Sequence, residues 1–325
     1  MDSRTLVVEV SVGGQHPGVD EAAYRKRFFD DPDFGLAEAR ALADGAGFAH
    51  LALTRVREGS SLVFALGDAR FLKLTPPFYA ESHAAERDAM LRVGHRLAPL
   101  AVPTIERTGA RGDWPWLISR RVPGAPLRSR LKRLDAAARD RLVVEIGGAA
   151  VAIRSIPLAG YERAFGPWER SLAECLPKLA EIHGARGCPP AWASRIQAWV
   201  GARAALLRDG LSEPRFTHAD LNGEHLLVDG DGRLSGVIDF ADAMRAPPEV
   251  ELLLPCLDFF RGDAGRQDAL FAAAGLELAG RERSEALLAL ALVNRFIDFQ
   301  DWFSKELRAG VGTLEDLAEA VFPSA

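Results

Sequence analysis

Residues Phe216 to Asp242 read Phe-Thr-His-Ala-Asp-Leu-Asn-Gly-Glu-His-Leu-Leu-Val-Asp-Gly-Asp-Gly-Arg-Leu-Ser-Gly-Val-Ile-Asp-Phe-Ala-Asp. Two short apolar runs, Leu226–Val228 and Leu234–Ile238, are separated by Asp-Gly-Asp-Gly, which is a strong signal for a β-hairpin. Polar side chains stand directly outside both runs: Asp220 and His225 before the hairpin, and Asp239 after it. Because a hairpin brings its two ends together, we expect these three side chains to converge.

The residue types at these ends suit phosphoryl transfer. That reaction needs a metal on the phosphate oxygens, a carboxylate at the acceptor hydroxyl and correct alignment, and little covalent chemistry from the protein. One carboxylate before the hairpin and one after it supply a base and a metal ligand. The alternative is that these acids only flank an ordinary hairpin, since Asp and Asn are common in turns. The presence of both halves at this spacing favours the catalytic interpretation.

The stretch resembles the catalytic and metal-binding segment of the aminoglycoside phosphotransferase family, which are small-molecule kinases with a protein-kinase-like fold. The pattern in that family is His-x-Asp-x-x-x-x-Asn, then a hairpin, then Ile-Asp-Phe/Trp. The resemblance implies that Asp220 is the catalytic base and that Asp239 binds magnesium. The family's second metal ligand is an Asn five residues after the catalytic Asp, and this chain has His225 there. Imidazole suits zinc or manganese better than magnesium, so either the metal preference or the role of His225 is left open.

A lysine inside an apolar strand is the second feature of the resemblance. Lys73 lies in the predicted strand Arg70–Leu74, where an unpaired ammonium group is costly to bury. The predicted helix Ala80–Val93 follows and carries Glu81 and Glu86. Kinase-like folds hold the nucleotide phosphates with such a strand lysine paired to a helix glutamate. Glu86 is the preferred partner, because the resemblance places this glutamate a few residues before an apolar pair. The alternative is a lysine that extends to solvent from an edge strand.

Two further segments are candidates for nucleotide contacts. A Gly/Ser turn with Ser60 and Ser61 joins the predicted strands Leu51–Val56 and Leu62–Leu66, which is a weak signal for a loop that covers phosphates. The segment after the strand that begins at Trp114 resembles the family's hinge, whose backbone binds adenine. The hinge candidates are four consecutive residues: Ser119, Arg120, Arg121 and Val122.

The sequence predicts an α+β protein with a bilobal, protein-kinase-like fold. Breaker residues at Pro123-Gly124 mark the boundary between an N-lobe, residues 1–122, with a small antiparallel sheet, and a mostly helical C-lobe, residues 123–325. The apolar periodicity predicts helices over these ranges: 20–29, 36–46, 134–156, 171–183, 190–207, 249–260, 267–274, 282–303 and 314–321. His183 is expected at the surface, and the resemblance implies that Glu251 steadies the catalytic loop.

Acidic residues crowd the second half of the chain, and four of them are candidate acceptor-binding residues: Asp242, Asp263, Asp298 and Asp301. A cleft of negative potential would raise the local concentration of a polycationic acceptor. The alternative is that these acids are spread over a solvated surface, as charges usually are.

Composition restricts the class of partner. A net charge of −5 argues against nucleic-acid binding and suits a cationic small molecule. No apolar run approaches the ~20 residues of a membrane span, and no secretory signal precedes the first strand. Three widely spaced cysteines form neither a disulfide framework nor a zinc site, which fits a reducing cytoplasm. We expect a cytoplasmic monomer or weak dimer without nucleic-acid or membrane partners.

Taken with the resemblance, these features predict an enzyme that uses ATP (or GTP) and Mg2+ to phosphorylate a hydroxyl of a small molecule. An aminoglycoside such as hygromycin B is the favoured acceptor, because Trp114-Pro115-Trp116 and Phe260–Asp263 resemble segments of the hygromycin B phosphotransferases. The fold does not choose among acceptors, so macrolide, sugar, homoserine and choline kinases stay as alternatives. A non-catalytic kinase-like protein that binds nucleotide is the second alternative.

Overall fold

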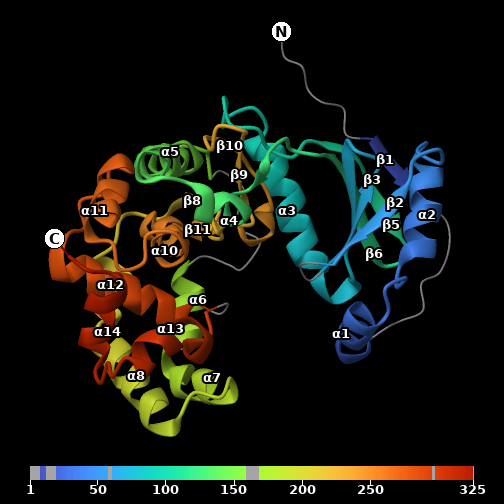
Figure 1. The fold of residues 1–325 in the computed structure, drawn as a ribbon. Helices are drawn as coiled ribbons and strands as arrows, with labels where there is room; N and C mark the ends of the chain where they lie inside the picture. The colour runs from blue at the N-terminus through green and yellow to red at the C-terminus, as the bar shows by residue number, and fades with distance from the viewer. Residues whose placement is uncertain (1–7, 12–19, 58–60, 159–167, 295–296, 325) are drawn as a thin grey trace.

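In the computed structural model of the chain, residues 8–11, 20–57, 61–158, 168–294 and 297–324 are described, and they form two lobes (Figure 1). A β-sheet with its helices makes the smaller lobe, and a larger lobe of helices lies beside it. The bilobal α+β architecture predicted from the sequence is confirmed.

The small-lobe sheet has six strands in the order β1-β5-β6-β4-β3-β2. Five of them pair antiparallel, as predicted, and β1 adds to the edge parallel to β5. The strands are β1 (Val8–Ser11), β2 (Leu53–Val56), β3 (Leu62–Leu66), β4 (Arg70–Leu74), β5 (Ile105–Arg111) and β6 (Trp114–Arg120). In this register Lys73 on β4 lies opposite Leu117 on β6, in the interior of the sheet. The lysine is therefore not on an edge strand.

Helices cover both faces of the sheet. The helices α1 (Glu21–Asp30) and α2 (Leu36–Gly45) pack on one face, where Tyr24 and Leu42 join a buried cluster with Phe64 and Trp116. The Asp20 side chain caps α1 by accepting from the Ala23 N–H, as the sequence indicates. After the 3-10 turn η1 (Pro77–Tyr79), α3 (Ala80–Val93) lies on the opposite face, between the sheet and the large lobe (Figure 1).

The buried core of the large lobe extends into α3 and the sheet. Met90 and Val93 of α3 and Leu117 of β6 belong to the same apolar cluster as the large-lobe helices. The chain that follows α3 is bonded to the large lobe as well, because Ala101 donates its N–H to the Ser235 carbonyl and accepts from the Val237 N–H. The helix that carries Glu86 is thus packed against both lobes.

The large lobe contains two small sheets among its helices. Strands β7 (Ala125–Pro126), β9 (Leu226–Val228) and β10 (Leu234–Val237) form one, and β8 (Arg215–Thr217) pairs with β11 (Met244–Ala246) in the other. The predicted hairpin is confirmed as β9 and β10. The helical segments are α4 (Leu127–Arg130), η2 (Leu131–Arg133), α5 (Ala136–Arg154), α6 (Trp168–Cys175), η3 (Leu176–Lys178), α7 (Leu179–Ala185), α8 (Pro190–Ala202), α9 (Ala204–Asp209), η4 (Phe240–Asp242), α10 (Glu249–Asp258), α11 (Ala264–Ala273), α12 (Gly280–Val293), α13 (Phe299–Arg308) and α14 (Leu314–Val321).

Three of the large-lobe helices predicted as continuous are interrupted in the structure, so these predictions are wrong. The range 171–183 is interrupted by η3, where Pro177 stands near the start of the 3-10 turn. The range 282–303 is two helices, because α12 ends at Val293 and Asp298 caps a new helix by accepting from the Gln300 and Asp301 N–H groups. The range 190–207 is broken at Arg203, two residues after Gly201, a poor helix former.

The prediction that His183 lies at the surface is also wrong. Its side chain is buried, and its Nε2 lies 2.9 Å from the Leu292 carbonyl oxygen on α12. Removal from water lowers the pKa of His183, so the imidazole is a neutral core residue. Within the described part of the chain, every helix is too short or too polar to traverse a lipid bilayer.

Candidate active site

The segment His218–His225 between β8 and β9 is the predicted catalytic loop, and a network of backbone hydrogen bonds fixes its shape. Ala219 is held in the left-handed region at φ 63°, which is uncommon for a residue other than glycine. The Asp220 N–H donates to His218 Nδ1, so the other ring nitrogen of His218 carries a proton and donates to the Ile238 carbonyl at 2.9 Å. Burial lowers the pKa of His218 to about 4, which keeps this imidazole neutral.

Asp220 is held by two side chains and stays partly open. The Asn222 side-chain amide donates to Asp220 Oδ1 at 2.8 Å, and His225 Nδ1 lies 3.1 Å from Asp220 Oδ2. The Asp220 side chain is 19% exposed, so a small molecule can reach it. A general base must lie within hydrogen-bond reach of the hydroxyl proton that it accepts. A carboxylate that is held in position and still reachable from solvent meets this requirement.

Asp239 follows β10 in an unusual backbone conformation. Its φ of 62° and ψ of 74° lie in the left-handed region, and its side chain accepts from the Ala241 N–H. Lys73 Nζ lies 3.7 Å from one carboxylate oxygen and His225 Nε2 lies 3.5 Å from the other. Removal from water acts to raise the pKa of Asp239, but the charges of Lys73 and His225 prevail and hold it well below its usual range.

The expected ion pair between strand and helix is present. Lys73 Nζ on β4 lies 2.7 Å from Glu86 Oε2 on α3, and both side chains are largely buried. Burial acts to lower the pKa of Lys73, but the charges of Asp239 and Glu86 outweigh it and raise that pKa above its usual range. Removing either partner of such a buried pair costs about 3–5 kcal/mol, because the other charge is left buried and unpaired.

Five predicted residues from both lobes thus form one continuous chain of charges. It runs in the order Glu86, Lys73, Asp239, His225 and Asp220, with carboxylates alternating with basic groups. Burial disfavours the imidazolium form of His225, but the hydrogen bond to Asp220 and the charge of Asp239 outweigh it and raise the pKa of His225 to about 9. Asp220 and Asp239 are therefore bridged by a single basic side chain.

The donors present at this point suit a divalent cation. His225 Nε2 and Asp239 Oδ2 are 3.5 Å apart. Two ligands about 2.1 Å from one metal, at right or tetrahedral angles, are separated by roughly 3.0–3.4 Å. In the described ranges, no group of three or more His, Cys, Asp and Glu side chains could hold a metal ion. A two-ligand site fits the kind of cation that completes its shell with waters and phosphate oxygens.

The structure describes all but one of the residues predicted from the sequence for nucleotide contacts in the Gly/Ser turn and the hinge. Ser60 lies outside the described residues, and Ser61 is buried where β3 begins. Among the hinge candidates, Ser119 pairs with Phe71 in the sheet, and the N–H groups of the next two residues are already bonded, Arg120 to Thr104 and Arg121 to Ala69.

Val122 is the last hinge candidate, and it is buried against the hairpin. A Cβ atom on Gly236 would come within 2.6 Å of Val122 Cγ1, so the absence of a side chain at Gly236 permits this contact. The hinge therefore rests directly on β10, a few residues from Asp239.

The four candidate acceptor-binding acids do not lie together in one cluster. Asp242 ends η4, and its charge contributes to the raised pKa of Lys73. Asp263 caps α11 and pairs with Arg266 at 2.6 Å, and α11 lies on the side of the large lobe away from the sheet (Figure 1). Asp298 caps α13, and Asp301 is exposed in the first turn of that helix. Two of the four therefore have a capping role in the fold.

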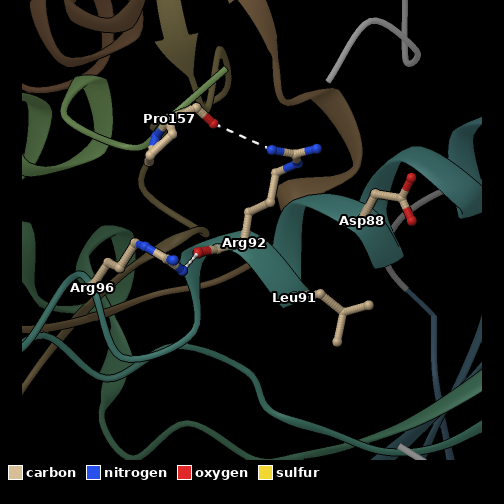
Figure 2. Close-up of a pocket in the computed structure, with 5 residues that line it drawn as sticks. All are labelled: Asp88, Leu91, Arg92, Arg96 and Pro157. Atoms are coloured by element: carbon tan, nitrogen blue, oxygen red, sulfur yellow. Dashed lines mark hydrogen bonds between the residues drawn. The ribbon is translucent and has the colours of Figure 1, made fainter. Parts of the chain in front are cut away.

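A separate pocket of about 430 Å³ lies between α3, the residues that follow it, and Pro157 just after α5 (Figure 2). Arg92 donates to the Pro157 carbonyl at 3.3 Å, and Arg96 donates to the Arg92 carbonyl. The other lining residues are Asp88 and Leu91. None of the residues in the charge chain lines this pocket.

Comparison with known proteins decides the family. A family model described as the phosphotransferase enzyme family matches residues 52–287, which is well over half of the chain. The chain belongs to the phosphotransferase enzyme family. The match spans Lys73, the hinge candidates and the whole of the catalytic loop and hairpin, so it covers every member of the charge chain.

Solved phosphotransferase structures share the fold. A GDP complex of aminoglycoside 2'-phosphotransferase-IIIa matches with a TM-score of 0.63 and 18% identity, over 83% of this chain and 92% of that one. A streptomycin–ATP complex of APH(2")-IIa matches with a TM-score of 0.60 and 15% identity, over 86% and 96%. Aminoglycoside phosphotransferase APH(3'')-Id from Streptomyces rimosus, in complex with ADP and streptomycin, matches with a TM-score of 0.56 and 20% identity. The match covers 80% of this chain and 98% of that one. The family predicted from the sequence is confirmed, whereas a special closeness to hygromycin B phosphotransferases stays a prediction.

The loop of this phosphotransferase is steadied by Glu251 of α10, as the resemblance implied. Glu251 Oε2 accepts from the His218 N–H at 2.6 Å, and its other oxygen has no partner in the described residues. Sequence reasoning missed two other contacts. One is the Asn222 amide on Asp220, for which the close spacing of the two residues is a signal. The other is Asp258, which accepts from the Gly223 N–H and from Arg128 and holds the tip of the loop.

Replacing Glu251 with Gln is expected to change how the stability of this phosphotransferase depends on pH. Burial raises the pKa of Glu251 from 4.5 to about 8. Between these values the unfolded carboxyl ionises while the folded one keeps its proton, so the free energy of unfolding falls as pH rises, by on the order of 4 kcal/mol. Gln keeps the acceptor for the His218 N–H and does not titrate. Relative to wild type, the Gln variant should therefore gain stability between pH 5 and pH 8.5.

The measurement is the midpoint of urea unfolding for both proteins across this pH range. Glu249→Gln is the matched control, because Glu249 is a buried glutamate on the same helix that accepts from Ser212. If the urea midpoint of wild type and that of Glu251→Gln change with pH in the same way, Glu251 is ionised in the folded protein and the prediction is wrong.

Proposed function

We propose that this protein is an ATP-dependent phosphotransferase that phosphorylates a hydroxyl group of a small molecule, with an aminoglycoside such as hygromycin B as the favoured acceptor. The observation that carries the proposal is the continuous chain from Glu86 through Lys73 and Asp239 to Asp220. Phosphoryl transfer is catalysed mainly by positioning and electrostatic stabilisation. The charge chain connects the Lys73 ammonium group, which can bind phosphate oxygens, to the Asp220 carboxylate, which can act as a base for the acceptor.

Each residue of the charge chain has a role in this proposal. Lys73, oriented by Glu86, binds the nucleotide phosphates. Asp239 and His225 hold a divalent cation, Mg2+ or a similar ion, which neutralises charge on the phosphate oxygens when bound. Asp220 accepts the proton of the acceptor hydroxyl as that oxygen bonds to the γ-phosphorus and the bond from the γ-phosphorus to the β,γ-bridging oxygen breaks, which releases ADP. Asn222 keeps the accepting carboxylate in position.

The hinge supplies the proposed adenine contact. Since the N–H groups of Arg120 and Arg121 are bonded within the small lobe, Val122 is the residue whose backbone we assign to the base. Ser61 borders the loop that we assign to the phosphates. ATP or GTP is the proposed nucleotide, since complexes with ATP, ADP and GDP occur among the similar structures.

Two observations support an aminoglycoside as the acceptor. Similar structures bind kanamycin, gentamicin and streptomycin, and they span a range of aminoglycoside phosphotransferases. The net charge of −5 also favours a cationic acceptor. Asp242, beside the charge chain, and the α13 residues Asp298 and Asp301 are the acids that we propose to act on it, whereas the Arg266 pair already neutralises Asp263.

The decisive experiment is an assay of a panel of aminoglycosides, macrolides, sugars, homoserine and choline with [γ-32P]ATP and Mg2+. Mass spectrometry of each product should show the addition of one phosphate to an aminoglycoside. Expression in a sensitive host should raise the inhibitory concentration of the same compound. If phosphate is transferred only to a neutral acceptor, the protein is a kinase but the aminoglycoside assignment is wrong. If the protein binds nucleotide and transfers phosphate to no acceptor, the non-catalytic alternative is favoured.

Asp301→Asn is expected to weaken acceptor binding and to leave the KM for ATP unchanged. One unit charge in solvent contributes on the order of 1 kcal/mol at contact distance, so the acceptor KM should rise about fivefold. Asp298→Asn should act in the same direction without loss of the helix cap, because Asn caps helices as well as Asp does. The wild-type acceptor KM should also rise with salt, since exposed charges are screened over about 8 Å.

The measurement is the steady-state KM for acceptor and for ATP at low and high salt. Asp113→Asn is the matched control, because Asp113 is an exposed acid in the small lobe with the same change of charge. An acceptor KM that is independent of both salt and the α13 substitutions would exclude this helix from the acceptor site.

A further inference from the structure

His225 has the contacts of a metal-binding histidine on both ring nitrogens. Its Nδ1 lies 2.9 Å from the Asp220 carbonyl oxygen and 3.1 Å from Asp220 Oδ2. Two acceptors at these distances place the proton on Nδ1. Histidines that bind metals characteristically donate their other ring N–H to a carbonyl or carboxylate, which fixes the tautomer and strengthens the ligand.

The second nitrogen is directed at the partner ligand. A metal ion that binds here would displace the proton from Nε2, whose lone pair would then face the cation beside Asp239 Oδ2, 3.5 Å away. The backbone keeps these two side chains together, because the Ile238 N–H donates to the His225 carbonyl at 3.0 Å, directly before Asp239. The pair is thus presented by the two ends of one hairpin and does not depend on lobe closure.

The Asn222 side chain completes the support of the ring. Its Oδ1 accepts from the N–H groups of Glu224 and His225, which directs its amino group toward Asp220. With the proton on Nδ1, this amino group and the ring N–H are both donors, so the Asn222 amide supports the ring through Asp220 and not through a bond to the imidazole. It holds the Asp220 carboxylate, whose Oδ2 and backbone carbonyl accept from Nδ1–H.

An imidazole at this position changes the donor set from two oxygens to one oxygen and one nitrogen. Mg2+ strongly prefers oxygen ligands and near-ideal octahedral geometry. First-row transition metals accept imidazole nitrogen readily, and Mn2+ accepts both donor types. An asparagine, which stands here in the family's sequence pattern, offers an amide oxygen instead.

We infer that His225 Nε2 is a direct nitrogen ligand of the nucleotide-bound cation and that it shifts the selectivity of the site from Mg2+ toward Mn2+. The inference rests on the proposed function, since it concerns the cation that accompanies the nucleotide. It adds a metal preference that an Asn at this position does not confer.

The experiment measures the ligand directly. Protein labelled with 15N-histidine is mixed with Mn2+ and a non-hydrolysable ATP analogue, and pulsed EPR detects 15N coupled to the metal. The wild-type complex should show this coupling, and His225→Asn should lose it. His95→Asn, which removes an exposed imidazole, is the matched control and should retain the signal.

A second measurement tests the selectivity. Displacement of Mn2+ by Mg2+ in the same complex gives the ratio of the two affinities, and His225→Asn should lower the preference for Mn2+ by about tenfold. Enzyme turnover is not needed for either readout. If the variant does not fold, the spectrum of the labelled wild-type protein alone decides whether the nitrogen is a ligand.

The outcomes separate this inference from the proposed function. A nucleotide-bound Mn2+ without histidine coupling, or an unchanged affinity ratio in a folded His225→Asn protein, overturns the metal assignment and leaves the kinase intact. Failure of the folded wild-type protein to bind any metal–nucleotide complex overturns both.

Discussion

Asp220→Asn should lower kcat by about a thousandfold and leave the Kd for nucleotide nearly unchanged. General bases contribute about 10²–10⁴-fold to rate, and the amide cannot accept the proton of the acceptor hydroxyl. The change is nearly isosteric, and an amide oxygen can still accept from the Asn222 side chain that now bonds Asp220 Oδ1. The loss should therefore be confined to the chemical step, as measured by single-turnover phosphorylation.

The matched control for this substitution lies on the same hairpin. Asp229 is exposed in the turn and accepts from the Asp231 and Arg233 N–H groups, both of which an Asn can also satisfy. Asp229→Asn should retain wild-type turnover. If Asp220→Asn turns over at a near-normal rate, the base lies elsewhere or the hydroxyl needs none.

Asp239→Asn should abolish transfer at every Mg2+ or Mn2+ concentration. The cation contributes several kcal/mol to such a reaction, which corresponds to a loss of roughly a thousandfold or more. Asn is the informative replacement, because it tolerates the left-handed φ of 62° that would strain an alanine. It also keeps an acceptor for the Ala241 N–H.

Metal titration distinguishes this loss from a damaged fold. Asp239→Asn should keep the far-UV circular dichroism of wild type and should bind the metal–nucleotide complex weakly. Its unfolding temperature should fall, because Lys73 and His225 lose a charged partner. Recovery of full turnover at high metal concentration would mean that Asp239 only raises affinity and that other groups position the cation. Asp229→Asn again supplies the charge-matched control.

The hairpin, the lysine strand and α3 could be predicted because local sequence determines them. Asp-Gly pairs specify the turn between β9 and β10, and Asp20 and Asp135 cap their helices through contacts three residues away. Lys73 is conspicuous in an apolar strand because its partner must be found elsewhere. In each case the signal and its structural consequence lie within a few residues of each other.

The contacts that could not be predicted join distant parts of the chain. Nothing near Asp258 in the sequence indicates that it accepts from the Gly223 N–H. The burial of His183 depends on the Leu292 carbonyl, which becomes its partner only when α7 packs on α12. The break at Arg203 lies near Gly201, but a single glycine inside a helical pattern does not by itself decide where the helix ends, since tertiary packing often overrides propensity.

The packing of α3 has a mechanical consequence. Met90 and Val93 of this helix are buried with the large-lobe core, whereas α1, α2 and one face of the sheet form a separate cluster. A rotation of the sheet relative to α3 would carry Lys73 with β4 and leave Glu86 with the body that carries Asp220. The 2.7 Å separation of Lys73 and Glu86 would then report how far the lobes have opened. A pair of spectroscopic labels on β3 and α3 should read the same displacement as the enzyme binds and releases nucleotide.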